Sequence, residues 1–239
     1  MVKKIIGSLL LIVIILVGLG GYMGFIPGVS SIFGSDKPRD LGVKITLEDS
    51  KKAQEMTGVI LSDLPSDTPI SQSIKFEGKK EVKVSFDDVS GSAIMNNRPW
   101  KYYPFYNVQV KIHQDGTIES SGMINMDKAL QYAESLGFST ADVNKAMDDF
   151  KIPKMNLPYY IKGKGEVVDN KVSLNVDTVQ AGRLTIPSSV VSQNQDRASR
   201  VVESAINRLD GFYARSLKVE DGKVVFDGTM AEKEMVVIN

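Results

Sequence analysis

The most prominent hydrophobic pattern is an unbroken apolar run from Ile5 to Ile26, preceded by Lys3 and Lys4 and followed by no charge until Asp36. As a helix, a run of this length would extend about 33 Å, enough to cross a hydrocarbon core of about 30 Å. Because the flanking positive charges lie on the N-terminal side, the pattern predicts a cytoplasmic N-terminus and an extracytoplasmic remainder. We therefore expect residues 1–26 to form a single-pass anchor in a cell membrane.

A cleaved signal peptide is the alternative interpretation of this segment, and it would also export the rest of the chain. Lys3 and Lys4 fit its charged start, but the apolar run is long and no Ala-x-Ala cleavage pattern follows it. An uncleaved anchor therefore fits better. The spacing of Gly20 and Gly24 is of the kind that lets two membrane helices approach closely, so a homodimer through this helix is a further hypothesis.

The remaining chain predicts a short juxtamembrane linker over residues 27–40 and one extracytoplasmic domain over residues 41–239. Polar and apolar spacing in its first part predicts four segments: a capped helix from Thr46 to Gly58, an irregular connection over residues 59–79, a strand from Lys80 to Phe86, and a helix from Asp87 to Asn97. Arg98 and Pro99 should stop the last helix, because a residue before proline avoids the α region.

Three turn dipeptides lie between segments in which apolar and polar residues alternate, and each predicts a β-hairpin: Asp115-Gly116, Asp169-Asn170 and Asp221-Gly222. Each hairpin has one apolar and one polar face. Together they predict an antiparallel sheet with one buried face and one solvated face.

Helical spacing predicts the cover for that apolar face. A broken pair covers Asp127–Leu136 and Thr140–Phe150, and a longer helix follows Pro187, with apolar residues recurring from Val190 to Leu209. We expect the long helix to lie across the sheet. The fold class is therefore α+β: an N-terminal transmembrane helix, then an antiparallel β-sheet of hairpins packed on or wrapped around a long helix.

Composition excludes several function classes. Without Lys3 and Lys4, 27 basic residues are dispersed among 29 acidic ones, so no basic stripe favours nucleic acid. The chain has no cysteine, which excludes disulfides and thiolate metal sites. It also has no Asn-x-Ser/Thr sequon, which fits a prokaryotic cell envelope.

The residues that usually carry catalysis are sparse. The single histidine, His113, lies on the polar phase of a strand beside a turn, which predicts a solvated surface residue. Nucleophile-elbow and phosphate-loop motifs are absent, and the acidic pairs Asp87-Asp88 and Asp148-Asp149 would diverge on a helix. We therefore expect no catalytic residue, no metal and no cofactor. A carboxylate-based hydrolase is a distant third hypothesis for the function.

One segment is unusually aromatic, with five aromatic side chains in seven positions between Pro99 and Asn107: Trp100, Tyr102, Tyr103, Phe105 and Tyr106. Such amphipathic rings favour a boundary between apolar and wet surroundings, so they are candidates for contact with a ligand or a membrane. The alternative is a loop whose rings pack beneath the edge of the sheet.

The order of motifs along the chain resembles a known family. After the anchor come Val108-Gln109-Val110-Lys111-Ile112, then Asp115-Gly116-Thr117-Ile118-Glu119-Ser120-Ser121-Gly122, then Gly182-Arg183-Leu184-Thr185-Ile186-Pro187, then Ser216-Leu217-Lys218-Val219 and Asp221-Gly222-Lys223-Val224. This combination, from Lys80 to Gly228, resembles small anchored proteins related to mycobacterial LmeA and bacterial YpmS-type proteins. Those are similar to tubular lipid-binding and AsmA-like domains, and the resemblance implies a curved sheet that wraps a helix around an elongated apolar groove. It implies no catalytic residue.

Two main hypotheses for the function follow. The first is a membrane-anchored domain that binds membrane lipid or another hydrophobic ligand, because such sites are mostly apolar with few polar groups. Six apolar residues of the hairpins and the long helix are candidates to line its groove: Val110, Ile112, Val190, Val202, Ile206 and Phe226. The second is a structural protein of the envelope that docks a partner protein through its sheet edge or its aromatic segment.

Overall fold

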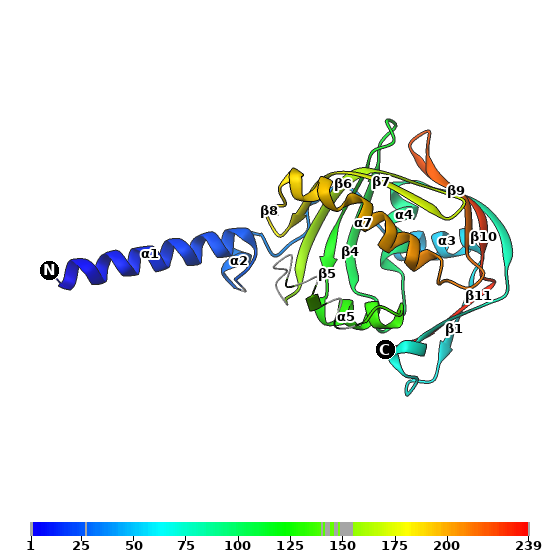
Figure 1. Cartoon of the computed structure of the whole chain (residues 1–239), viewed down its shortest axis with the longest axis horizontal. Coiled ribbons are helices and arrows are strands. Elements are labelled where there is room, and N and C mark those ends of the chain that lie inside the picture. Colours follow the sequence, from blue (N-terminus) through cyan, green and yellow to red (C-terminus); the bar gives the residue numbers. More distant parts are fainter. Residues whose placement is uncertain are drawn as a thin grey trace.

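The domain is built around a strongly curled antiparallel sheet that forms a half-barrel, drawn in Figure 1. The structure is a computed structural model, and it describes residues 2–26, 28–139, 141, 144–145, 148 and 155–238, with side chains on the first helix from Val13 onward. The strands of the half-barrel are β3 (Lys80–Phe86), β4 (Phe105–Ile112), β5 (Ile118–Ile124), β6 (Leu157–Val168), β7 (Lys171–Ala181), β8 (Leu184–Thr185), β9 (Tyr213–Glu220) and β10 (Lys223–Met230). The main order is β3-β10-β9-β6-β5-β4, and β7 pairs with the other edge of β6.

All three predicted hairpins are confirmed. They connect β4 to β5, β6 to β7 and β9 to β10, each with antiparallel register. At the tip of the second hairpin, Asp169 and Asn170 both have positive φ angles of 50° and 60°. Two successive left-handed residues form the tight turn that matches the twist of the flanking strands, and Asn and Asp tolerate that region better than most residues.

The strand register assigns side chains to the two faces of the half-barrel. Val167 pairs with Leu217, and Leu217 pairs with Phe226, so these residues lie on one face, which we call the inner face. Val167 and Phe226 are buried together in one cluster. Because side chains alternate along a strand, Ile161 of β6 and Leu174 of β7 also lie on the inner face, while their neighbours Lys162 and Asn175 lie on the outer face.

Helix α4 (Asp88–Asn96) covers the free edge of β4 with a stripe of polar side chains. The backbone N–H groups of Ile112, Val110 and Val108 donate to Asp88, Ser92 and Asn96 at 2.7, 2.7 and 2.8 Å. Four residues on a helix advance about 6 Å and two residues on a strand about 6.7 Å, so every fourth residue of α4 lies beside every second residue of β4. The stripe therefore protects the edge as a neighbouring strand would.

The other predicted elements of this first part are also confirmed. Helix α3 (Leu47–Thr57) begins after Thr46, whose side chain exchanges hydrogen bonds with Asp49, and it ends at Gly58 with a φ angle of 61°. Strand β3 has the predicted bounds, and α4 begins after Asp87, as expected. Helix α5 (Met126–Ser135) confirms the first member of the broken pair, whereas Thr140–Phe150 lies mostly outside the described residues.

The prediction of an irregular connection over residues 59–79 is wrong. This segment contains β1 (Ile60–Leu64), the short helix η1 (Ile70–Gln72) and β2 (Ile74–Glu77), which flank β11 (Lys233–Val237) in a second sheet. β1 pairs with β11 in parallel and β2 pairs with it antiparallel. Both strands are short and have proline and serine around them, so no long alternation marks them, and their partner strand lies at the other end of the chain.

The second sheet carries a buried ion pair. Glu234 of β11 is buried, and the Arg98 guanidinium donates to its carboxylate at 2.9 Å. Burial raises the pKa of Glu234 above its ordinary value, although Arg98 acts in the opposite direction.

The long helix does not lie across the sheet, which corrects the prediction. Helix α7 (Ser188–Ile206) has its closest strand contacts with β7, and its side chains engage the edge of that strand. The Val176 N–H donates to Gln195 at 2.7 Å and the Val172 N–H donates to Glu203 at 3.4 Å. This helix therefore guards the β7 edge in the way α4 guards β4, and its apolar residues cover less of the inner face than expected.

Helix α1 (Val2–Met23) projects from the domain in Figure 1, and the short helix α2 (Val29–Ile32) folds back against its end. Within the part of the chain that the structure describes, no helix is long and apolar enough to cross a membrane. The membrane anchor stays a prediction from sequence. The segment predicted as a linker, residues 27–40, contacts the domain: the Arg39 guanidinium donates to the Gln180 side chain at 2.8 Å, and Arg183 donates to the Phe33 carbonyl.

Candidate functional site

The inner face of the half-barrel is largely apolar, and much of it is only partly covered. Along β7, Val172, Leu174 and Val176 are half-buried, and so are Val82 and Val84 of β3. A filled core of this size would enclose such residues almost completely. The inner face is therefore apolar and incompletely covered by the described residues.

Ile161 is the clearest case of incomplete covering. It lies on the inner face opposite Val179, yet 41% of its surface is exposed. Its neighbours along the strand, Tyr160 and Lys162, point to the outer face by strand alternation. A large apolar side chain is thus presented on the inner surface without a protein partner that covers it among the described residues.

The six predicted lining residues fall into two groups. Ile112 and Phe226 are buried on the inner face, Val110 is half-buried on the same face, and Ile206 of α7 packs against the cluster that contains Phe226. On α7, Val190 is half-buried, whereas Val202 is 40% exposed. Helical spacing alone placed Val202 with Ile206; the residue of this helix that is buried is Val191. The difference arises because α7 turns its polar Gln195 and Glu203 toward the β7 edge.

The predicted aromatic segment is packed into the domain. Trp100 and Tyr102 are buried in a cluster with Val236, and the Trp100 indole N–H donates to Ser73 at 3.2 Å. Of the five aromatic residues only Tyr106 is exposed. The burial of Trp100 and Tyr102 favours the interpretation in which this loop packs beneath the sheet.

Part of the aromatic segment nevertheless reaches the inner face. Tyr103 and Phe105 join Tyr132 of α5 and Tyr159 of β6 in a series of edge-to-face contacts, with ring centroids 5.6 to 6.4 Å apart. Burial raises the pKa of the Tyr103, Tyr132 and Tyr159 hydroxyls, so these rings stay neutral at physiological pH. They form a cluster of aromatic rings at one end of the inner face, where the Tyr159 hydroxyl is 3.2 Å from the Ser120 hydroxyl.

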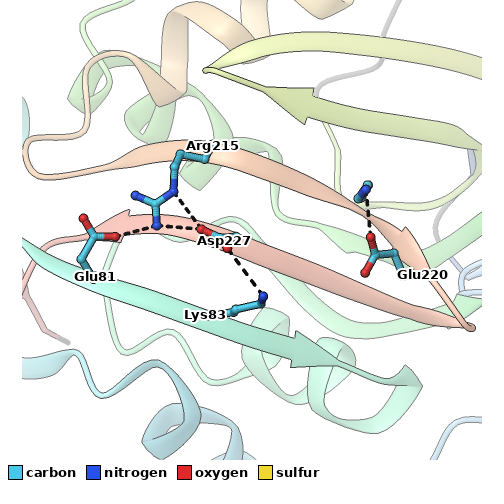
Figure 2. A network of polar contacts seen from close by, with 6 residues as sticks. Glu81, Lys83, Arg215, Glu220 and Asp227 are labelled. Carbon is cyan, nitrogen blue, oxygen red and sulfur yellow. Dashed lines mark hydrogen bonds and ion pairs between the residues drawn. The ribbon is translucent and has the colours of Figure 1, made fainter.

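The outer face of β3, β9 and β10 has the opposite character. Figure 2 shows Arg215 of β9 between Glu81 of β3 and Asp227 of β10, with nitrogen to oxygen distances of 2.6 and 2.7 Å. Lys83 extends the network to Asp227 at 3.9 Å. Exposed pairs of this kind add little stability, but they keep this face hydrated. On these strands the outer face is therefore charged, whereas the inner face is apolar.

A second polar network lies on the outer face of β5 and β6, and sequence reasoning missed it. His113 is 2.7 Å from the Glu119 carboxylate, and the Tyr160 hydroxyl donates to the same carboxylate at 2.6 Å. The hydrogen bond from Tyr160 lowers the pKa of Glu119, with a further contribution from His113. The guanidinium of Arg39 lies 3.7 Å from the centre of the Tyr160 ring. The register of His113 and Glu119 across the hairpin could have revealed their proximity.

The structure also has a cleft between η1, the end of α5 and the turn after α7, with a volume of about 350 Å³. Six of its ten lining residues are polar or charged, including Lys75, Glu77, Arg208 and Asp210. Arg208 is already engaged, because it donates to the Leu136 carbonyl and lies 4.9 Å from the centre of the Phe138 ring. This cleft does not offer the apolar surroundings that a hydrophobic ligand needs.

Among the described residues, no group of three or more His, Asp or Glu side chains is arranged to hold a metal ion. Comparison with known proteins adds no assignment: no protein-family model, no curated protein and no solved structure matches the chain. The resemblance to LmeA-like and YpmS-like proteins therefore stays a prediction from the motifs.

Proposed function

We propose that this protein is a membrane-anchored domain that binds the acyl chains of membrane lipid along the inner face of its half-barrel. The observation that carries the proposal is the incomplete covering of that face, above all the 41% exposure of Ile161 within an apolar strand surface. A mostly apolar site with few polar groups suits a hydrocarbon ligand, and no catalytic step is required of it.

The edge contacts of α7 explain why the inner face can stay open. In a fold with a filled core, a long amphipathic helix would press its apolar stripe onto the middle of the sheet. Here Gln195 and Glu203 tie the helix to the edge of β7, and only Ile206 near its end reaches the cluster around Phe226. The helix thus bounds the proposed groove on one side.

The proposal includes retention of residues 1–26 as an anchor in the cell membrane, with the domain outside the cytoplasm. Its support is the unbroken apolar run from Ile5 to Ile26 with Lys3 and Lys4 before it. A reporter fused after Asn239 should be active only outside the cytoplasm, and the protein should stay with membranes after an alkaline wash. Release of a fragment beginning near Ser31 would instead identify a cleaved signal peptide.

The test of lipid binding is site-specific photo-crosslinking in the full chain within its own membrane. A benzophenone side chain at Leu174 would lie on the inner face, and one at Asn175 would lie on the outer face of the same strand. Leu174 is eight residues from Gly182, or about 26 Å along the strand direction, so a lipid that reaches it has left the plane of the bilayer.

The proposal predicts a lipid-mass adduct at Leu174 and none at Asn175, measured by mass spectrometry of the irradiated protein. Unfolding of both variants is monitored by the fluorescence of Trp100, the only tryptophan. An unfolding transition like that of the wild type shows that the fold tolerates the benzophenone side chains. The absence of an adduct at Leu174 in a folded variant would refute the proposal. A crosslink from Asn175 to another protein would instead favour the alternative function, a structural envelope protein that docks a partner protein.

A further inference from the structure

The end of α1 is joined to the domain by a close backbone contact with the turn between β7 and β8. Gly182 has a φ angle of 60°, and any Cβ there would collide with the Met23 carbonyl oxygen. The Arg183 N–H donates to that same oxygen at 3.1 Å, so it satisfies a carbonyl that the helix end leaves without a partner. We call these residues the socket: Met23, Gly24, Gly182 and Arg183.

Further contacts hold the socket from the other side. Gly24 has a φ angle of 95°, and a Cβ there would lie 2.8 Å from the Ser35 carbonyl oxygen. The buried Ser35 hydroxyl donates to the Gly21 carbonyl at 2.6 Å, which engages another carbonyl of the last helical turn. Val29 of α2 occupies the space beside Gly21. These glycines are therefore packed against their own chain, and their presence is explained without a second copy.

The side chains around the socket are those that proteins place at a membrane surface. The Arg183 guanidinium lies 4.8 Å from the centre of the Tyr22 ring, and Tyr22 contacts the edge of Phe33 at 6.0 Å. A cation at a helix C-terminus is favourable, and aromatic and arginine side chains together span the boundary between hydrocarbon and water.

Three large apolar side chains beside the socket are exposed: Ile32 by 81%, Phe33 by 40% and Leu184 by 39%. They come from two segments far apart in sequence, and the socket brings both to the end of α1. Their apolar surface continues that of the helix, where Val13 to Leu16 and Leu19 are also exposed. We call these three residues the collar.

We propose that the collar is seated in the outer surface of the lipid bilayer, so that the socket holds the half-barrel upright with the start of β6 and the end of β7 against the membrane. This inference rests on the membrane anchor that the proposed function includes. Ile161 lies opposite Val179, three residues or about 10 Å from Gly182, so the uncovered part of the inner face would open directly above the bilayer.

The absence of native cysteine allows one fluorophore to be attached at a chosen position in the full chain. The single-cysteine variants are Ile32→Cys and Leu184→Cys on the collar, with Glu220→Cys at the remote β9–β10 hairpin as the control. Each is reconstituted into vesicles of phosphatidylcholine and phosphatidylglycerol that contain a nitroxide-labelled lipid. The inference predicts strong quenching at both collar positions and none at Glu220.

The socket is tested by Gly182→Ala in the Leu184→Cys background, with Arg183→Gln as a second variant should the first fail to fold. Either change should reduce the quenching at Leu184, while quenching at Ile32 in the matching background persists because α2 holds it against α1. Quenching at Leu184 no greater than at Glu220 would overturn the inference, and so would quenching that neither socket variant alters.

The same preparations separate this inference from the proposed function. A lipid adduct at Leu174 without quenching at Leu184 would refute the seated collar and leave lipid binding intact. Quenching at Leu184 without an adduct at Leu174 would support the seated collar and refute lipid binding.

Discussion

The polar stripe of α4 gives the most specific stability prediction, because Asn96 alone serves both backbone groups of a fully buried residue. Its side-chain oxygen accepts from the Val108 N–H at 2.8 Å, and its amide donates to the Val108 carbonyl at 2.7 Å. Asn96→Ala would remove both partners. A buried backbone group without a partner costs about 1–3 kcal/mol, and alanine returns about 0.5 kcal/mol in helix propensity.

With both backbone groups counted, the expected net loss is about 1.5–5.5 kcal/mol, which lowers the urea midpoint by about 1–3 M for a slope of about 2 kcal/mol/M. Trp100 fluorescence reports this transition, and hydrogen exchange should quicken at Val108. Asn97→Ala is the matched control, because Asn97 makes only a 3.5 Å contact to the Ser50 carbonyl. A loss below about 0.5 kcal/mol for Asn96→Ala, or an equal loss for Asn97→Ala, would refute the edge-covering role of the stripe.

Three further predictions follow from burial and charge. Because burial raises the folded pKa of Glu234, the folded state holds this proton more strongly than the unfolded state, and stability falls as pH rises through the folded pKa. Arg98→Gln should raise the pKa of Glu234 further. Urea titrations of this variant should show a loss of about 2–3 kcal/mol at about pH 8 and a smaller loss at about pH 5. Val202→Asp should change stability by under about 0.5 kcal/mol, whereas Ile206→Asp should cost about 2–3 kcal/mol; equal effects in thermal melts would contradict the placement of α7. Trp100→Ala should cost about 3–5 kcal/mol by circular dichroism, and an unchanged melting temperature would contradict its place in the core.

Local patterns predicted the elements whose signals are local. The turn pairs at Asp169-Asn170 and Asp221-Gly222 require left-handed backbone and therefore mark hairpins on their own. The capping exchange between Thr46 and Asp49 likewise marked the start of α3. These features need no knowledge of distant contacts, so the sequence alone was sufficient.

The placement of α7 depended on information that helical periodicity lacks. An apolar stripe shows that one side of a helix is buried, but it does not show whether the helix lies over the middle of a sheet or along its edge. Here Gln195 and Glu203, read as solvated polar residues, accept hydrogen bonds from β7. Polar residues four or eight positions apart on a helix are the sequence signal that could have indicated a helix lying along the edge of a sheet.

The candidate site was predicted in its chemistry more than in its geometry. Apolar alternation in the hairpins identified the inner face, including Ile112 and Phe226, but not the exposure of Ile161, which depends on what lies opposite it. The joint between Gly182 and Met23 was also beyond prediction, because the two residues are far apart in sequence and the contact is made by backbone atoms.

The central claim, that the inner face holds lipid, is tested most directly by native mass spectrometry of the full chain released from detergent micelles. The wild type should retain bound lipid, and Ile161→Glu should lose it while remaining folded, because the side chain at this position reaches solvent when the groove is empty. Lys162→Glu, on the outer face of the same strand, should retain lipid as the wild type does. Release of the wild type without lipid, or equal retention by Ile161→Glu, would contradict the account.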